Sequence, residues 1–96
     1  MQLSAAPVTL YTTPAATSFT VRNIHVANES ALDARFTVSI GLDSSGNRLY
    51  RNVLVQGNGG AFDWSGYMPI FPGDVIEAFA DAAGLLTITI SGVETT

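Results

Sequence analysis

Residues 34–42 read ARFTVSIGL, and this stretch decides the fold class. Apolar residues recur at every second position, with small residues between them: Phe36, Val38, Ile40 and Leu42 alternate with Thr37, Ser39 and Gly41. A period of two is typical of a β-strand that packs one face on a core and turns the other toward solvent. We therefore expect a strand here, with an apolar buried face and a small polar exposed face.

The same period recurs along the chain between turn-forming residues, and no segment has a convincing helical period. Further strands are expected at residues 8–12, 18–28, 48–56, 61–65, 66–71, 74–82 and 86–91. Seven to eight short antiparallel strands predict an all-β fold, a single small β-sandwich or jelly-roll-like domain over residues 8–96. Residues 1–7 have no periodicity, so we expect an N-terminal arm that a partner orders.

Two local details refine this prediction. Within residues 18–28, Phe19 and Val21 keep one phase of the alternation. Ile24 and Val26 keep the other, which predicts a β-bulge within Arg22-Asn23. Pro72-Gly73 predicts a type II turn over residues 71–74, because Pro fixes the first φ angle and Gly adopts a positive second one. Asp, Ser, Gly and Asn residues predict another turn over residues 43–47.

The strand at residues 74–82 has an unusual outward face. Its even positions carry Ile and Ala and are expected to face the core, which places Val75 and Phe79 on the outside. Residues 78–85 also have helix-forming composition, but strand is the favoured interpretation. Two apolar side chains on the outer face of a small sandwich suggest a surface that another molecule covers.

The composition restricts the possible functions. Charged residues make up 12% of the 96 residues, against about 25% in an average soluble domain, and the basic residues are four Arg with no Lys. Because Lys is depleted at interfaces, this bias fits a surface that is largely contacted. The net charge of −4 argues against nucleic-acid binding. The chain has no Cys, no recognisable signal segment and no apolar run that could cross a membrane.

We expect no catalytic residue, metal or cofactor. His25 is the only histidine, and its place in the alternation puts it on the outward face. The acidic residues are scattered singly, so no acid-base pair is evident. The turn at residues 43–47 lacks the downstream Glu of a calcium loop, and the Gly-rich stretch at residues 57–60 lacks the Lys of a phosphate-binding loop.

Phe62, Trp64 and Tyr67 form the one aromatic cluster in the sequence. Aromatic faces can stack on sugar rings, so this cluster is a candidate ligand site. The favoured alternative is that Trp64 caps one end of the core and that Tyr67 lies at an interface.

Three stretches carry a family resemblance. They read LYTTPAATSFTVRNIHVANES, FTVSIG and FDWSGYMPIFPGDVIEAFADAAGLLTITISGVE, in this order within residues 9–94. The order and spacing of these motifs resemble those of small virion proteins of tailed bacteriophages. Ala16 is one departure, because the family pattern usually has Gly at this position of the turn after Pro14.

The resemblance implies a non-enzymatic β-sandwich component of a phage particle. We expect a capsid decoration (minor capsid) protein on the virion surface, made in the host cytoplasm, that binds the major capsid protein or other virion proteins and contacts neither nucleic acid nor membrane. It would form a homo-oligomer, with a trimer favoured. The candidate contacts are Met1, Gln2 and Leu3 of the arm, together with Val75 and Phe79. The alternatives are a tail, neck or baseplate component, or a carbohydrate-binding attachment module that uses the aromatic cluster.

Overall fold

The computed structural model describes residues 1–41 and 46–95, and every regular element in these residues is a β-strand. The strands are β1 (Val8–Thr12), β2 (Ser18–Asn28), β3 (Ala34–Ile40), β4 (Arg48–Val55), β5 (Gly60–Ile70), β6 (Val75–Ala80) and β7 (Leu86–Thr95). The all-β prediction is confirmed. The segments expected at residues 61–65 and 66–71 are one continuous strand, β5. Leu42 and residues 43–45 of the predicted turn lie outside the described residues.

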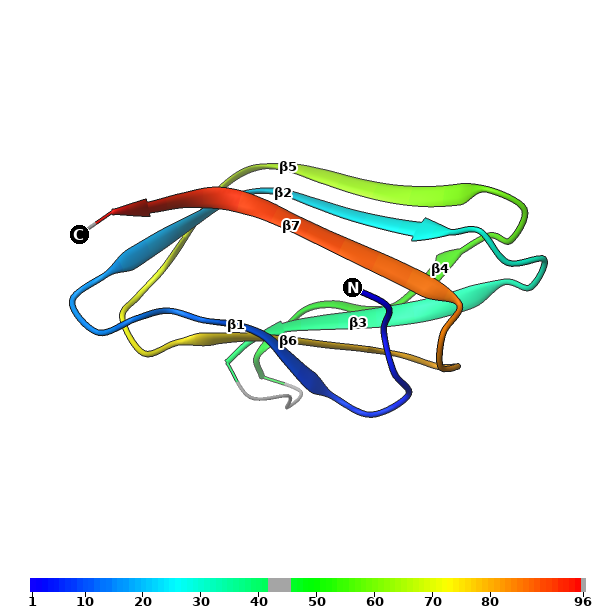
Figure 1. Cartoon of the computed structure of the whole chain (residues 1–96), viewed down its shortest axis with the longest axis horizontal. Helices are drawn as coiled ribbons and strands as arrows, with labels where there is room; N and C mark the ends of the chain where they lie inside the picture. The colour runs from blue at the N-terminus through cyan, green and yellow to red at the C-terminus, as the bar shows by residue number, and fades with distance from the viewer. Residues whose placement is uncertain (42–45, 96) are drawn as a thin grey trace.

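The strands form two antiparallel sheets that lie face to face (Figure 1). One sheet has the order β5-β2-β7, and the other has the order β1-β6-β3-β4. We call them the three-stranded and the four-stranded sheet. Pro69 lies in β5, an edge strand of the three-stranded sheet, where a residue without an N–H group is tolerated. As these strand orders show, most strands that are neighbours in a sheet are far apart in the sequence.

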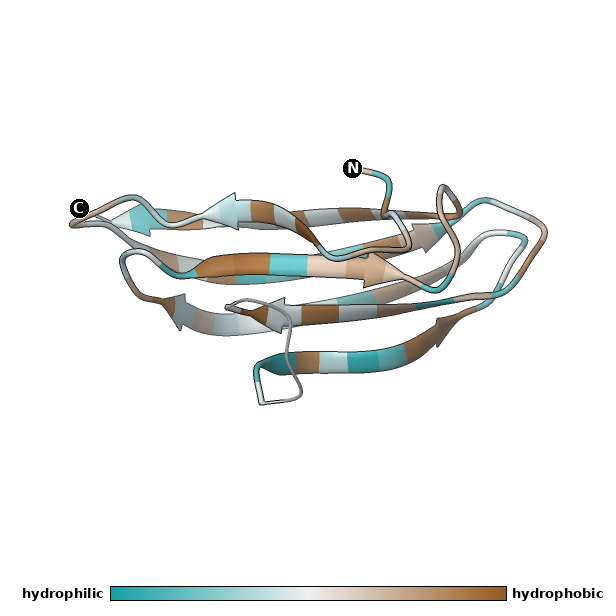
Figure 2. Ribbon diagram, turned by 90° about the horizontal axis from the view of Figure 1, so that it is seen from below, coloured by the Kyte–Doolittle hydropathy of each residue, from teal (hydrophilic) through white to brown (hydrophobic). Residues whose placement is uncertain are grey.

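The core is built from the inward faces of the strands, as the alternation predicts. Apolar and polar residues alternate along the ribbon in Figure 2. Among the described residues, the fully buried large apolar side chains are Leu3, Val21, Ile24, Val26, Phe36, Val38, Val55, Ile70, Ile76 and Leu86. Burial of such side chains contributes roughly 1.5–3 kcal/mol each and is the main stabilising term of a small sandwich.

The predicted bulge and the predicted turn are both present. The register of β2 shifts between Val21 and Asn23 in its pairing with β5 and with β7. Against β7 the extra residue is Arg22, which is exposed, whereas against β5 Arg22 lies opposite two residues, Gly66 and Tyr67. Val21 and Ile24 therefore both face the core. At the turn, Gly73 has φ +85° and the N–H of Asp74 donates to the carbonyl of Phe71 at 3.1 Å.

The turn after Pro14 is strained. The N–H of Thr17 donates to the carbonyl of Pro14 at 3.2 Å, which closes a β-turn. Ala16 has φ +58° in this turn, although its Cβ makes this region unfavourable. The departure from the family pattern thus falls on a position where the backbone favours glycine.

The outward face of β3 differs from the prediction. Thr37 and Ser39 point away from the core but are only 2% and 1% exposed. Phe79 of β6 is opposite Thr37, and Arg48 of β4 is opposite Ser39. The Arg48 guanidinium lies 5.8 Å from the centre of the Phe79 ring, so long side chains of both neighbouring strands cover the short ones between them. The expectation of a solvent-exposed face overlooked that β3 is an interior strand.

The N-terminal arm is also ordered differently from the prediction. Leu3 is 1% exposed and belongs to the core, so its assignment as a free partner contact is wrong. Its N–H donates to the carbonyl of Leu86 in β7, and the N–H of Ala80 in β6 donates to the carbonyl of Ser4, both at 2.8 Å. The arm therefore joins the two sheets, since its backbone bonds to β6 in one sheet and to β7 in the other. The side chain of Leu3 fills the gap between these two strands.

Asn28 is a buried polar residue that the sequence did not single out. Its side-chain amide donates to the carbonyls of Leu32 at 2.7 Å and Val55 at 3.1 Å. Its side-chain oxygen accepts from the N–H and the hydroxyl of Ser30 at 3.0 and 2.6 Å. All its hydrogen-bonding capacity is thus used to hold the connection after β2 against the end of β4.

Candidate interaction surfaces

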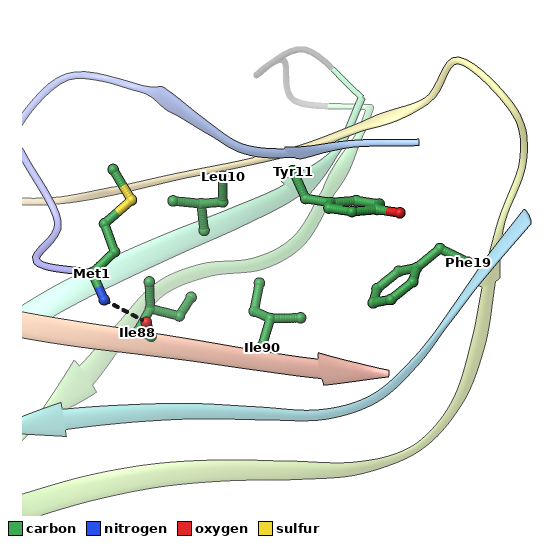
Figure 3. A pocket seen from close by; sticks show the side chains of 6 residues that line it. All are labelled: Met1, Leu10, Tyr11, Phe19, Ile88 and Ile90. Carbon is green, nitrogen blue, oxygen red and sulfur yellow. Dashed lines mark hydrogen bonds between the residues drawn. The ribbon is translucent and has the colours of Figure 1, made fainter. Parts of the chain in front are cut away.

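One side of the sandwich has an apolar hollow between the two sheets, which we call the seam hollow. It has a volume of about 180 Å³. Its lining consists of Met1, Leu10, Tyr11, Phe19, Ile88 and Ile90. Figure 3 shows these side chains pointing toward a common space, from the arm, from β1 and from the strands of the other sheet. β1 and β7 are edge strands of different sheets, so the hollow lies where the sandwich is open.

The edge of β7 beside this hollow is only partly paired. The arm covers its first part, because Gln2 bridges Thr87 and the N–H of Ile88 donates to the carbonyl of Met1 at 2.9 Å. In an antiparallel ladder, the backbone groups of alternate residues point to the same side. Since Leu86 and Ile88 bond to the arm, the N–H and carbonyl groups of Ile90, Gly92 and Glu94 point to the same outer edge. We call residues 90–94 the open β7 edge.

Tyr11 and Glu94 connect the two sheets at one end of the hollow. The Tyr11 hydroxyl donates to the Glu94 carboxylate at 2.5 Å. This hydrogen bond, with smaller contributions from burial and from the negative charge of Glu94, raises the pKa of Tyr11 to about 12. The phenol therefore stays protonated and continues to donate throughout the neutral range. Neither residue was a sequence candidate, because their pairing joins positions 83 residues apart.

Exposed apolar side chains gather on the outer face of the three-stranded sheet. Tyr67 is 74% exposed, Phe71 66% and Val93 54%, and Pro69 is also exposed. Thr20 of β2 pairs with Pro69 on one side and with Val93 on the other, which places these residues in one row. Tyr67 occupies the alternate position before Pro69 in β5, and Phe71 follows directly after the end of this strand. We call these four residues, Tyr67, Pro69, Phe71 and Val93, the outer patch.

The β2 bulge directs Arg22 onto this patch. Its guanidinium carbon lies 4.3 Å from the centre of the Tyr67 ring, and a guanidinium N–H group donates to the Tyr67 hydroxyl at 3.3 Å. Both residues are exposed. A cation over an aromatic face fixes the ring orientation, so this exposed tyrosine is held in place.

The aromatic cluster that the sequence suggested is not formed. Phe62 faces the core, with ring centres 5.2 Å from Phe36 and 4.9 Å from Tyr50. Trp64 is on the same inward face and packs against the core, as the favoured alternative predicted. Tyr67 lies on the opposite face, so the three rings offer no common platform to a ligand.

The other predicted contact residues have different environments. Met1 is 60% exposed and Gln2 is exposed, although their backbones pair with β7. Val75 and Phe79 are on the outward face of β6, as predicted, and both are half-buried. Arg48 lies over Phe79, and Thr12 is opposite Val75, so the chain itself covers part of this face.

His25 faces outward, as predicted, and its ring contacts the carboxylate of Asp63 on the neighbouring strand. Its Nδ1 atom lies 2.6 Å from a carboxylate oxygen of Asp63. Among the described residues there is no group of three or more His, Cys, Asp or Glu side chains that could hold a metal ion. The part of the chain that the structure describes also has no helix long and apolar enough to span a membrane.

The fold and these surfaces define a class: a small two-layer antiparallel β-sandwich with an open seam and an exposed apolar patch. Beyond this class the comparisons add nothing, because no protein-family model, curated protein or solved structure gives a significant match to the chain.

Proposed function

We propose that the chain is a non-enzymatic structural protein of a phage virion, a capsid decoration protein that binds the assembled capsid. The outer patch is the observation that supports this function best. Two aromatic side chains and a valine that are more than half exposed, with Tyr67 and Val93 on the outer face of one sheet and Phe71 just after β5, are characteristic of a protein-binding surface. The motif order that resembles phage virion proteins supplies the kind of partner.

The charge distribution supports a protein partner. Arg22 is the charged side chain that stacks on the patch, and Arg is the basic residue most enriched at interfaces. Tyr67 is already oriented by Arg22, so its ordering on binding would cost little entropy. The patch thus combines apolar area with side chains that are partly fixed before contact.

Decoration would act through mass action. A decoration protein binds the assembled lattice and not the free capsid subunits. It therefore stabilises the lattice by a free energy that increases with the ratio of the decoration protein's concentration to its Kd. Repetition over many symmetry-related positions multiplies a modest contact energy. In this proposal the chain needs no chemistry of its own, only a surface that fits the assembled form.

Particles assembled with the gene for this chain deleted provide the test. We expect the purified chain to bind such particles and to raise the temperature at which they release DNA. Phe71→Ser should weaken binding, since it removes an aromatic ring that the rest of the chain does not cover. Leu54→Ser is the matched control, because Leu54 is an exposed apolar residue on β4 in the other sheet. Absence of the chain from wild-type particles, or equal loss with both variants, contradicts the proposal.

A further inference from the structure

We propose that the open β7 edge accepts an extended strand from a neighbouring protein chain, with alternate apolar side chains of that strand filling the seam hollow. The incoming strand would run antiparallel to β7 and end beside Met1. That the neighbour is a virion protein rests on the proposed function. The strand addition itself rests on the geometry of β7, the arm and the hollow.

The arm already shows this mode of binding within the chain. Residues 1–3 pair antiparallel with β7, and the side chain of Leu3 enters the space between the sheets. The backbone of Leu3 bonds to Leu86 and that of Met1 bonds to Ile88. Among the described residues, the arm is thus an added strand that covers the edge from Leu86 to Ile88.

The next part of the edge has the same geometry without the added strand. Ile90, Gly92 and Glu94 continue the alternation of Leu86 and Ile88, so their backbone groups point outward in the same line. Exposed strand edges of this kind are templates for pairing with another chain. Gly92 has no side chain and is exposed, so an incoming backbone can approach it closely.

The seam hollow defines the chemistry of the incoming strand. A cavity of about 150 Å³ with apolar walls accommodates a benzene ring, so the 180 Å³ hollow has room for one aromatic or branched aliphatic side chain. Leu10, Phe19 and Ile90 supply an apolar wall on three sides. The Tyr11–Glu94 hydrogen bond closes one end, where the one carboxylate on the edge is already engaged. The strand that fits is therefore uncharged and apolar at every second residue.

A tethered strand tests this inference without any virion. Fusing Val-Thr-Val-Thr directly before Met1 continues the arm along β7, with the two valines opposite Ile90 and Gly92 and pointing toward the hollow. We expect a higher Tm and amide hydrogen exchange at Ile90 and Gly92 that is slower by about tenfold or more, as for a newly formed backbone hydrogen bond.

The control extension is Thr-Val-Thr-Val, which has the same composition but turns its valines away from the hollow. It should protect these amides far less. Equal protection by both extensions, or none by either, overturns the inference. Because the particles are not involved, this result stands apart from the binding assay of the proposed function.

The same strand can be supplied in trans. An end-blocked Val-Thr-Val-Thr-Val peptide should shift the NMR signals of residues 90–94, and Ile90→Lys should abolish the shifts by placing a charge in the hollow. Thr89→Lys, on the outer face of the same strand, should retain them. If the signals shift with protein concentration alone, the occupant is a second copy of the chain and the proposed partner is wrong.

Discussion

Replacing Ala16 by glycine is expected to stabilise the protein. Ala16 has φ +58°, in the left-handed region where the Cβ atom of any L-residue crowds the following carbonyl. The residue is exposed, so removal of its methyl group gives up little packing. The turn itself is retained, since the hydrogen bond from Thr17 to Pro14 involves only backbone atoms.

The magnitude follows from two opposing terms. Relief of the left-handed conformation contributes about 1–2 kcal/mol. Glycine also makes the unfolded chain more flexible, which costs about 0.4–1 kcal/mol. The difference between these ranges is about 0–1.6 kcal/mol, with a central value of about 0.8 kcal/mol in the free energy of unfolding, or roughly 3–6 °C in Tm for a domain of this size.

Urea denaturation followed by the fluorescence of Trp64, with a thermal melt followed by circular dichroism, measures this gain. Ala15→Gly is the matched control, because Ala15 is the neighbouring exposed residue of the same turn and its φ angle is not positive. At position 15 glycine only makes the unfolded chain more flexible and relieves no strain, so Ala15→Gly should be less stable than the wild type. Ala16→Val should be the least stable of the three, because a β-branched side chain is strongly disfavoured at positive φ.

The reasoning would be refuted by an Ala16→Gly variant that is no more stable than the wild type while Ala15→Gly behaves as expected. Such a result would mean that the turn relaxes at no cost in the folded protein.

Three further changes test other parts of the structure. Asn28→Ala should lower the free energy of unfolding in urea by about 2 kcal/mol, because it removes the side-chain donor to the buried carbonyl of Val55 together with three further hydrogen bonds to Ser30 and Leu32. Gly92→Ala should cost about 2 kcal/mol or more in the same assay, since an added Cβ would lie 2.2 Å from the carbonyl oxygen of Thr20. The Tyr11 phenol, with its pKa raised from 10.0 to about 12, should stabilise the fold below pH 10 and lose this effect as the pH rises toward 12, because the unfolded chain releases the proton first. Glu94→Gln should shift the late phenol titration, followed by ultraviolet absorbance, back toward pH 10.

Each of these changes has a comparison that isolates its cause. Gly46→Ala should be almost neutral, because an added Cβ there meets nothing within 4 Å. If Gly46→Ala and Gly92→Ala cost the same, steric contact is not the reason. A phenol titration that Glu94→Gln leaves unchanged would remove the explanation for Tyr11, and an Asn28→Ala variant as stable as the wild type would show that water replaces the amide.

The strands themselves were predictable from local sequence, and the reason is physical. Alternation of apolar and polar residues indicates which face of a strand is buried. A change in the phase of this alternation indicates an inserted residue, as within Arg22-Asn23. Pro72 and Gly73 likewise encode their turn through their own φ preferences. These features depend on neighbouring residues alone.

The surfaces depend on which strands are neighbours, and the local pattern does not contain that information. The seam hollow brings together Leu10, Phe19 and Ile90 from three strands, and the burial of Leu3 requires a gap between two sheets. The separation of the aromatic rings, in contrast, follows from the local pattern. Phe62 and Trp64 are at even positions of a strand and Tyr67 at an odd one, so alternation alone separates their rings to opposite faces.

The hydrogen bonds of the arm also have a consequence for how the protein folds. Met1 bonds to Ile88, 87 residues away, and Ser4 bonds to Ala80, so both sheets are tied together by segments from opposite ends of the sequence. β2 cannot complete its sheet until β5 and β7 have both been synthesised. Proteins dominated by such distant pairings fold on the scale of milliseconds to seconds. On the ribosome, residues 1–4 would emerge well before β6 and β7 and would be among the last to reach their native contacts.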